Sequence, residues 1–364
     1  MEPAPEPAPE PALEPALEPA LAGIRVVDAS ELLPGPYASL VLRDLGAEVI
    51  KVERPPMGDS ARHIAPGMFK VVNEGKVSVR IDLKSTEGLA RFVELIADSD
   101  VLITGYRPGV AERLNIGHDR LNAVNPRLIH AAITGFGQSG ELAGVPGHDI
   151  NFLSAAGVLS LTPGHPINTP TGSGLPIGDL CGSMFAVAAI LAALRQRERS
   201  GEGQFLDISI TAALRHSLAP RLGVLLQGGE EAWTPLPGYG AFTCGDGRRI
   251  VLAAMEDHFW NDLVELLDSD ALRRPEYAQY AARRSAAAAI NTHIASALLK
   301  QPADYWLRLM RNSDLPVTAD VRAIQDGKAT AIENDPLDFS GGSVRSRFPV
   351  PMKGLPAGAA KPLR

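Results

Sequence analysis

The chain has only two cysteines in 364 residues, Cys181 and Cys244. Two cysteines in separate contexts give neither a disulfide framework nor a cysteine metal cluster, so we expect no metal. The same scarcity fits a reducing compartment, and we expect a cytoplasmic protein. Basic residues are also in the minority, 35 against 42 acidic ones, for a net charge of −7. This balance argues against nucleic-acid binding, which needs clustered positive charge.

Long apolar runs are missing as well. The richest one, residues 184–194, is short for a membrane span and leads directly into Arg195 and Arg197, so we expect no membrane span. The chain also lacks the G-x-G-x-x-G spacing of dinucleotide-binding loops after its first strand, which disfavours a nicotinamide cofactor. Hydrophobic residues make up 45% of the chain, enough for the cores of two domains.

Composition divides the chain into four segments. Residues 1–22 repeat Glu-Pro-Ala, in which proline prevents a regular helix and glutamate favours solvent, so they are predicted to be a disordered tail. Residues 23–227 are predicted to form a large α/β domain. Residues 228–335 are predicted to form a smaller α+β domain. Residues 336–364 are expected to extend back over the large domain or a partner subunit.

Alternating strands and helices define the large domain. Six apolar stretches are predicted as strands, with helices or glycine-rich loops between them, and this βαβ alternation predicts a parallel sheet. The predicted strands are residues 24–28, 48–53, 77–82, 101–104, 128–133 and 205–209. Ser85 is a predicted cap for the helix that follows the third strand.

Asp179 stands out among the acidic residues. It lies between Gly178 and Gly182, at a predicted helix start, where it would be the N-cap. Its carboxylate has a structural interpretation, because a cap satisfies free backbone N–H groups. It also has a catalytic one, because N–H groups at a helix start can stabilise an enolate while the carboxylate acts as base or nucleophile.

His148 is the second candidate. It lies between Gly147 and Asp149, and an imidazole with a pKa of about 6.5 suits proton transfer in both directions near neutrality. Most single histidines are surface or core residues, and that alternative stays open. Glu256 is the third candidate. It either stabilises the start of a helix or orients His148.

Three cations follow predicted strands. Arg54, Lys84 and Arg107 each come just after one. Strand ends face the ligand crevice in doubly wound sheets, where cations suit phosphate groups. Each of the three is also a plausible solvated surface charge.

These features together resemble one family. The sequence is similar to the family III CoA-transferase superfamily (CaiB/BaiF type), and within it to the α-methylacyl-CoA racemases. The resemblance is dense from residue 23 to about residue 209 and thinner afterwards. It is carried by residues 23–28, 33–38, 44–53, 81–84, 106–110, 125–129, 135–140 and 147–151.

The resemblance implies a Rossmann-like large domain and an interlocked homodimer that binds acyl-CoA between domains of different subunits. It implies catalytic roles for His148, Asp179 and Glu256, with Glu256 paired to the histidine. It also implies thioester-binding segments at Arg54, Ile81, Asp82, Leu83, Lys84, Pro146, Gly147, Asp149, Ile150 and Asn151. Arg107, a candidate from its place after a strand, is expected to join them in binding CoA.

The expected reaction is racemisation at the α-carbon of a 2-methylacyl-CoA. Inversion needs proton removal on one face and delivery on the other, which His148 and Asp179 can perform without a cofactor. The chief alternative is CoA transfer between carboxylic acids, with Asp179 forming an acyl anhydride. A third is a non-catalytic acyl-CoA-binding protein. The chain has no tetraglycine loop of the kind that some transferases carry, which favours the racemase.

Overall fold

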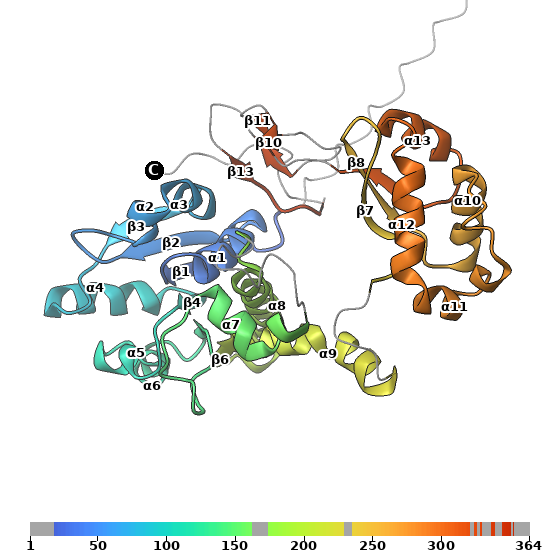
Figure 1. The fold of residues 1–364 in the computed structure, drawn as a ribbon. Helices are drawn as coiled ribbons and strands as arrows, with labels where there is room; N and C mark the ends of the chain where they lie inside the picture. The colour runs from blue at the N-terminus through green and yellow to red at the C-terminus, as the bar shows by residue number, and fades with distance from the viewer. Residues whose placement is uncertain are drawn as a thin grey trace, which may run out of the picture. The chain divides into compact units, whose positions relative to one another are not determined.

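The computed structural model describes residues 18–161, 174–228, 235–320, 324–325, 328–329, 336–338, 344–350 and 352. Most of the predicted N-terminal tail lies outside them. The contacts divide the chain into two units, one made of Met1–Gln227 with Glu333–Arg364 and the other of Gly228–Ile332. Figure 1 shows a mixed sheet-and-helix architecture in the first unit and a helix-rich second unit.

A six-stranded, wholly parallel sheet forms the centre of the first unit, as the alternation of strands and helices predicts. The strand order is β3-β2-β1-β4-β5-β6. The order therefore reverses between β1 and β4, where doubly wound sheets bind ligands. The strands are β1 (Arg25–Ala29), β2 (Glu48–Glu53), β3 (Val77–Arg80), β4 (Val101–Thr104), β5 (Ile129–Thr134) and β6 (Gln204–Ser209).

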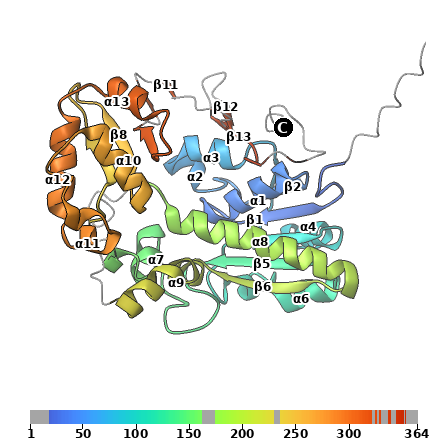
Figure 2. The ribbon, with the colours of Figure 1, turned by 90° about the vertical axis from the view of Figure 1, so that its right-hand side faces the viewer.

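Helices cover both faces of this sheet and bury two apolar cores. One core joins the sheet to α1 (Pro34–Asp44), α7 (Asp149–Ala156), α8 (Ile177–Ser200) and α9 (Ile210–Gly228). The other joins it to α4 (Thr86–Ala97) and α6 (His118–Val124). Figure 2 shows α8 running along β5 and β6. Short helices α2 (Ala61–Ile64), α3 (Pro66–Val72) and α5 (Val110–Arg113) complete the unit, with the 3₁₀ turn η1 (Leu159–Leu161).

Helix α8 alone has the length and hydropathy of a membrane span among the described residues. The sequence predicts no apolar run long enough to span a membrane, but α8 has the length and hydropathy of one. The helix instead packs against α1 and the sheet, and Ala186, Val187 and Ile190 are buried there. These contacts are typical of a core helix in an α/β domain.

Local signals explain several element boundaries. Ser85 caps α4, because its Oγ accepts a hydrogen bond from the backbone N–H of Gly88 at 3.0 Å, as predicted. The sequence predicts a turn at residues 33–36 and a helix from residue 37, but α1 already begins at Pro34. Proline suits a first helical turn, because its missing N–H would have no intrahelical partner there.

The second unit contains an antiparallel sheet in the order β7-β8-β9, packed on helices. Its strands are β7 (Tyr239–Thr243), β8 (Arg249–Ala253) and β9 (Val317–Ala319). Its helical elements are α10 (Asp257–Leu267), η3 (Pro275–Tyr277), α11 (Tyr280–Ser285), α12 (Ala287–Leu298) and α13 (Ala303–Met310). The sequence predicts one helix over 281–299, but the chain forms α11 and α12 in succession.

Two short hairpins follow in the C-terminal part. They are β10 (Ile324–Gln325) with β11 (Lys328–Ala329), and β12 (Leu337–Asp338) with β13 (Arg345–Ser346). In the first unit, Arg345 of β13 forms an ion pair with Glu74, with Nε and Oε1 3.1 Å apart.

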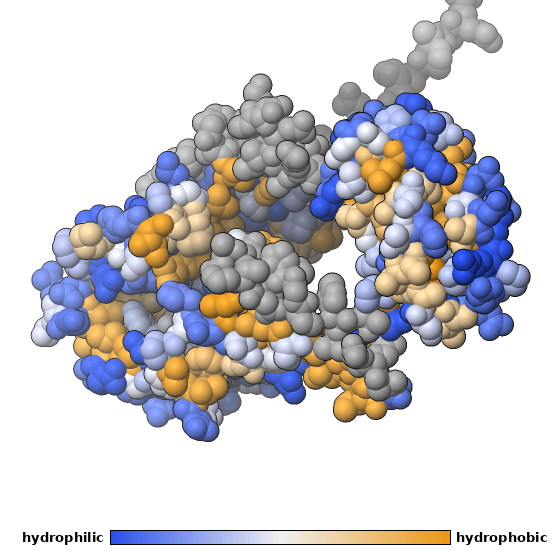
Figure 3. All heavy atoms as spheres, in the orientation of Figure 1, coloured by the Kyte–Doolittle hydropathy of each residue, from blue (hydrophilic) through white to orange (hydrophobic). Residues whose placement is uncertain are grey.

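The far end of α9 is exposed and apolar. Val224 is 47% exposed and Leu226 is 88% exposed. Figure 3 shows hydrophobic spheres gathered over this end of the helix. Exposed apolar side chains that cluster on one element are typical of a surface that a partner covers.

Candidate functional site

A cavity of about 300 Å³ lies at the carboxyl edge of the parallel sheet. Its walls come from the segments that follow β1, β4 and β5, where the strand order reverses, and from the starts of α7 and α8. This is the place where an open α/β sheet binds its ligand. The lining includes Ser30, Glu31, Gly105, Arg107, Gly135, Pro146, Gly147, His148, Phe152 and Asp179.

The structure brings His148 and Asp179 to this one cavity, although 30 residues separate them in the chain. Each lies at the start of a helix, His148 before α7 and Asp179 in the first turn of α8. A substrate bound in this cavity would therefore lie next to both an imidazole and a carboxyl group.

Asp179 is not the N-cap of α8, and that expectation is wrong. The helix begins at Ile177 and its N-cap is Pro176, so Asp179 is the third helical residue. Its carboxylate accepts no hydrogen bond from another residue that the structure describes. Burial first, and then the charge of Asp149, raise the pKa of Asp179 to about 7. A carboxyl group with such a pKa can both take up and release a proton near neutrality.

Asp149 caps α8 in place of Asp179. Its Oδ1 accepts the backbone N–H of Asp179 at 2.9 Å, and its carboxylate also accepts the N–H of Gly178. Burial raises the pKa of Asp149, while these two hydrogen bonds act to lower it. Because Asp149 is the first residue of α7, this contact joins the starts of the two helices that carry His148 and Asp179.

In the part of the chain that the structure describes, the backbone amides without a hydrogen-bond partner lie at the start of α7 and not of α8. In the first turn of α8, the N–H groups of Gly178 and Asp179 bond to Asp149, and those of Ile177 and Leu180 bond to backbone carbonyls. In contrast, the N–H groups of Asp149 and Ile150 donate to no other residue that the structure describes. The first-turn amides of α8 thus have partners within the protein, and the expectation that they stabilise an enolate stays a prediction.

His148 is the exposed N-cap residue of α7. Its backbone N–H donates to Oδ1 of Asn151 at 3.0 Å, which fixes the start of the helix. Two glycines make room for Phe152 beside it. A Cβ at Gly135 or Gly147 would lie 2.0 or 2.7 Å from the Phe152 ring, closer than atoms can approach.

The predicted cations do not all reach the cavity. Arg107 lines it and is exposed. Arg54 forms an ion pair with Glu31, a lining residue, with Nε and Oε1 3.3 Å apart. Lys84 is exposed and outside the lining.

Residues 81–84, predicted to bind the thioester, form a turn in the structure. Its side chains contact either the protein core or the turn itself. Ile81 is buried in the core beneath α4, and Leu83 packs against the same core. Oδ1 of Asp82 accepts the backbone N–H of Lys84 at 3.0 Å. None of the four lines the cavity, so their role in thioester binding stays a prediction.

Glu256 belongs to the second unit. It is the exposed N-cap residue of α10, and its side chain forms no cap hydrogen bond. Its pairing with His148 stays a prediction.

Sequence reasoning missed the polar residues that follow β1. Ser30 and Glu31 line the cavity, and Asp28 lies fully buried beneath them. Lys76 Nζ lies 3.1 Å from Asp28 Oδ2, and Lys51 Nζ lies 3.7 Å from Asp28 Oδ1. Burial opposes ionisation of Asp28, but these two cations hold its pKa well below the usual range. The run of Asp, Ser and Glu at a strand end was the signal that could have revealed this cluster.

Comparison with known families gives one match over most of the chain. The model of CoA-transferase family III matches residues 21–338. This range spans both structural units.

Individual relatives carry two kinds of activity in their names. The chain is 33% identical to acetyl-CoA:oxalate CoA-transferase of Acetobacter aceti, over 91% of this chain and 89% of the relative. It is 36% identical to human alpha-methylacyl-CoA racemase, over 67% of this chain and 64% of the relative.

A solved structure shares the fold. A CaiB/BaiF family protein from Brucella suis superposes with a TM-score of 0.79 and 26% identity, over 95% of this chain and 97% of that one. The similarity therefore extends over nearly the whole of both chains.

Proposed function

Because the chain belongs to CoA-transferase family III, we propose that it binds an acyl-CoA thioester and moves a proton at the α-carbon of a 2-methylacyl group. One observation carries the racemase proposal. His148 and Asp179 line the same cavity at the carboxyl edge of the sheet. Racemisation needs two proton-transferring groups around one carbon, and the cavity offers one imidazole and one carboxyl group.

The protonation behaviour of Asp179 supports proton transfer. With its pKa raised to about 7 by burial and by Asp149, its carboxyl group can alternate between acid and base near neutral pH. His148 supplies an imidazole as the second group that can carry a proton. In one direction of the reaction one group removes the α-proton and the other returns a proton to the opposite face. In the reverse direction their roles exchange.

The enolate oxygen needs hydrogen-bond donors, because the α-proton of a thioester is only weakly acidic. The amides of Asp149 and Ile150 follow the cavity-lining His148 at the positive end of α7, have no hydrogen-bond partner among the described residues, and are suited to this task. Preorganised donors of this kind contribute about 3–4 kcal/mol to transition-state stabilisation. Asp149 and Ile150 would thus contact the thioester through their backbone.

The CoA part of the substrate needs further contacts with the protein. We assign them to Arg54, Ile81, Asp82, Leu83, Lys84, Arg107, Pro146, Gly147 and Asn151. Of these, Arg107, Pro146 and Gly147 line the cavity itself. Glu256 is assigned to orient His148, and no cofactor beyond the substrate takes part.

CoA transfer is the second candidate. The similarity to acetyl-CoA:oxalate CoA-transferase covers 91% of the chain, and Asp179 would act there as the nucleophile. Its carboxylate would attack the thioester carbonyl carbon, expelling the CoA thiolate and leaving an acyl anhydride. That step needs ionised Asp179, and a pKa near 7 leaves the carboxyl largely protonated below neutrality. At pH 7 about half of the Asp179 carboxyl groups are ionised, so this pKa is compatible with both reactions.

We further propose a cytoplasmic homodimer. The exposed apolar end of α9, around Val224 and Leu226, is a surface that a second copy could cover. Sedimentation analysis of the wild-type chain and of the Leu226→Glu variant tests this proposal. Loss of the dimer in the variant supports the assignment, and a monomeric wild-type protein contradicts it.

The decisive experiment uses a single enantiomer of a 2-methylacyl-CoA in deuterated water. Racemisation with α-deuterium incorporation, without an acceptor acid, supports the proposal. We expect His148→Ala and Asp179→Ala each to reduce exchange by at least about 100-fold. CoA transfer to an added acid without exchange would establish the transferase, and binding without either reaction would leave a binding protein.

A further inference from the structure

One residue in the wall of the candidate cavity has an unusual backbone conformation. Leu32, in the loop between β1 and α1, has a φ of 66° and lines the cavity. This left-handed conformation is unfavourable for leucine, because its Cβ then lies too close to a backbone carbonyl oxygen. Such conformations persist only where the surrounding structure holds them, and they are concentrated at functional sites.

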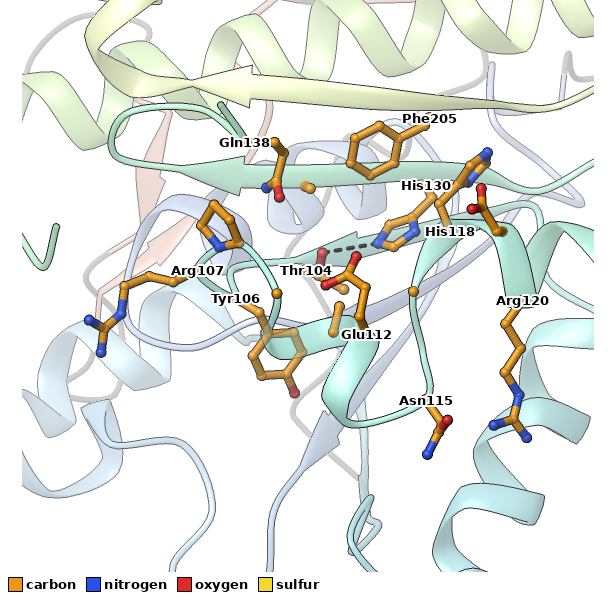
Figure 4. A pocket seen from close by; sticks show the side chains of 16 residues that line it. Thr104, Tyr106, Arg107, Glu112, Asn115, His118, Arg120, His130, Gln138 and Phe205 are labelled. Carbon is orange, nitrogen blue, oxygen red and sulfur yellow. Dashed lines mark hydrogen bonds between the residues drawn. The ribbon is translucent and has the colours of Figure 1, made fainter. Parts of the chain in front are cut away.

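A second left-handed residue gives a comparison within the chain. Asn115 has a φ of 58° and lines the neighbouring cavity of about 580 Å³. Figure 4 shows Asn115 in the turn that follows α5. Asparagine tolerates this conformation, and the N–H of Asn115 donates to the backbone carbonyl of Glu112, three residues earlier, at 2.9 Å. Leucine lacks this tolerance, so the conformation of Leu32 depends on a contact from elsewhere in the chain.

The carboxylate of Asp59 supplies that contact. Its Oδ1 accepts the N–H of Leu32 at 3.1 Å and the N–H of Ala61 at 2.9 Å. Asp59 is 1% exposed, and its Oδ2 lies 3.1 Å from Nζ of Lys51, which is equally buried. Hydrogen bonds to an ionised carboxylate are stronger than neutral ones. Asp59 therefore joins the loop after β1 firmly to the segment that follows β2.

Lys51 holds the same loop at a second point. Its Nζ donates to the backbone carbonyl of Ser30, so the ion pair of Lys51 and Asp59 fixes the residues on either side of Glu31. The side chain of Glu31 in turn accepts the hydroxyl of Ser60 at 2.8 Å. Three consecutive lining residues are thus anchored to β2 and to the segment behind it.

The loop is also connected to the helix that carries Asp179. Ser183 is buried in α8, with its Oγ 2.8 Å from the carbonyl oxygen of Pro34 and 2.7 Å from that of Asp179. Pro34 lines the same cavity. The loop therefore lies fixed between β2 and α8, and a relaxed Leu32 would change the shape of the cavity that contains Asp179.

We propose that Asp59 and Lys51 are positioning residues of the candidate site. Their buried ion pair holds Leu32 in its left-handed conformation and so preforms the cavity wall against which the acyl group binds. Neither side chain lines the cavity, so both act through the loop. The effect on the reaction rests on the proposed acyl-CoA function, whereas the contact with Leu32 is testable without substrate.

Amide hydrogen exchange tests the contact whatever reaction the cavity supports. In the ligand-free wild-type chain the amide of Leu32 should exchange slowly, and Asp59→Ala should accelerate it by at least about tenfold. Asp100→Ala is the matched control, because Asp100 also accepts a backbone N–H, from Arg25 at 2.8 Å, and pairs with Arg197, but at the amino edge of the sheet. Fast exchange of Leu32 in the wild type, or equal acceleration in both variants, overturns the proposal.

A double-mutant cycle tests the positioning role. Asp59→Ala should lower kcat/KM for 2-methylbutanoyl-CoA in α-proton exchange by about tenfold or more. Leu32→Gly removes the backbone penalty, so in that background the loss should be at least about fivefold smaller. Asn115→Gly is the matched background, in which the full loss should remain. Equal losses in all three backgrounds would leave Asp59 with a purely structural role and overturn the proposal.

Two further measurements keep the test decisive. Thermal melting checks folding, and Asp59→Asn, which keeps an acceptor for the amide, replaces Asp59→Ala if the alanine variant is unfolded. It should give the same order of losses with smaller factors. If the wild-type chain catalyses no exchange, the proposed reaction fails, and the cycle is measured on the dissociation constant of 2-methylbutanoyl-CoA instead. The same reduced loss in the Leu32→Gly background then supports the positioning role, and equal losses contradict it.

Discussion

The Oδ1 atom of Asp149 lies 2.9 Å from the backbone nitrogen of Asp179. One carboxylate thus caps the helix that carries the other, while its charge raises the pKa of that second carboxyl group. Position and protonation of Asp179 therefore depend on the same neighbour. Four predictions follow from this contact and from the buried charges around it.

Asp149→Asn removes the negative charge beside Asp179 but keeps the hydrogen-bond acceptor. The amide oxygen can still accept the N–H of Asp179, but the negative charge is gone, so the pKa of Asp179 should fall. The acid limb of the α-proton exchange rate should then move to lower pH, with little change in KM. A ¹³C NMR titration of the Asp179 carboxyl group gives the same readout without turnover. Asp207→Asn is the matched control, since Asp207 accepts the N–H of Gln138 elsewhere in the unit.

Asp179→Asn should stabilise the protein at alkaline pH while abolishing exchange. The folded state holds the Asp179 proton up to a pKa of about 7, against 3.8 as the ordinary value. Stability therefore falls between about pH 4 and pH 7 and remains lower above. Each pKa unit corresponds to about 1.4 kcal/mol, so the variant should gain a few kcal/mol at pH 8 and nothing at pH 3.5. Urea unfolding at both pH values measures this, and an equal gain at both would contradict it. Asp98→Asn, at an exposed site, is the control.

Lys76→Met should destabilise the first unit by about 3–5 kcal/mol, because it leaves the buried Asp28 carboxylate without one of its cations. The depressed pKa of Asp28 contributes stability above its unfolded value, and this is lost as the pH falls. The variant should therefore also show a weaker loss of stability on acidification. Lys70→Met, at an exposed position of α3, should change unfolding in urea by less than about 0.5 kcal/mol.

Gly178→Ala and Gly223→Ala form a matched pair, because both glycines are helical. A Cβ at Gly178 would lie 2.8 Å from Asp149 Oδ1, whereas one at Gly223 meets nothing within 4 Å. Alanine should stabilise α9 at position 223 by up to about 1 kcal/mol. At position 178 it should displace the Asp149 carboxylate and lower the exchange rate. Equal melting temperatures and rates for both variants would refute the close contact.

The sequence predicts the parallel sheet because the βαβ pattern is local and strong. It also predicts the cap at Ser85, whose partner Gly88 is only three residues away. The start of α8 was mispredicted because its cap, Asp149, lies 30 residues earlier in the chain. Local signals favour Asp179, but a distant carboxylate satisfies the same amides and lets the helix begin earlier. The strand order β3-β2-β1-β4-β5-β6 is likewise set by packing between distant segments.

The candidate site was likewise predictable only where the signal is local in the sequence. Glycine neighbours and polarity identified His148 and Asp179 as candidates, and the structure brings both to one cavity. The contact between the rings of His118 and His130, whose centroids lie 6.0 Å apart, is not predictable from the sequence, because it forms only when β5 and α6 pack. Their spacing of 12 residues in the chain carries no periodic signal.

The start of α7 concentrates several functions in very few residues. His148, the carboxylate of Asp149 and the two open amides lie within three consecutive positions, 148–150. Because the Asp149 carboxylate also holds the first turn of α8, a change in these three residues alters the starts of both helices at once. Laboratory evolution that randomises these codons would therefore also shift Asp179, whereas one that keeps Asp149 and varies positions 148 and 150 would leave the start of α8 in place.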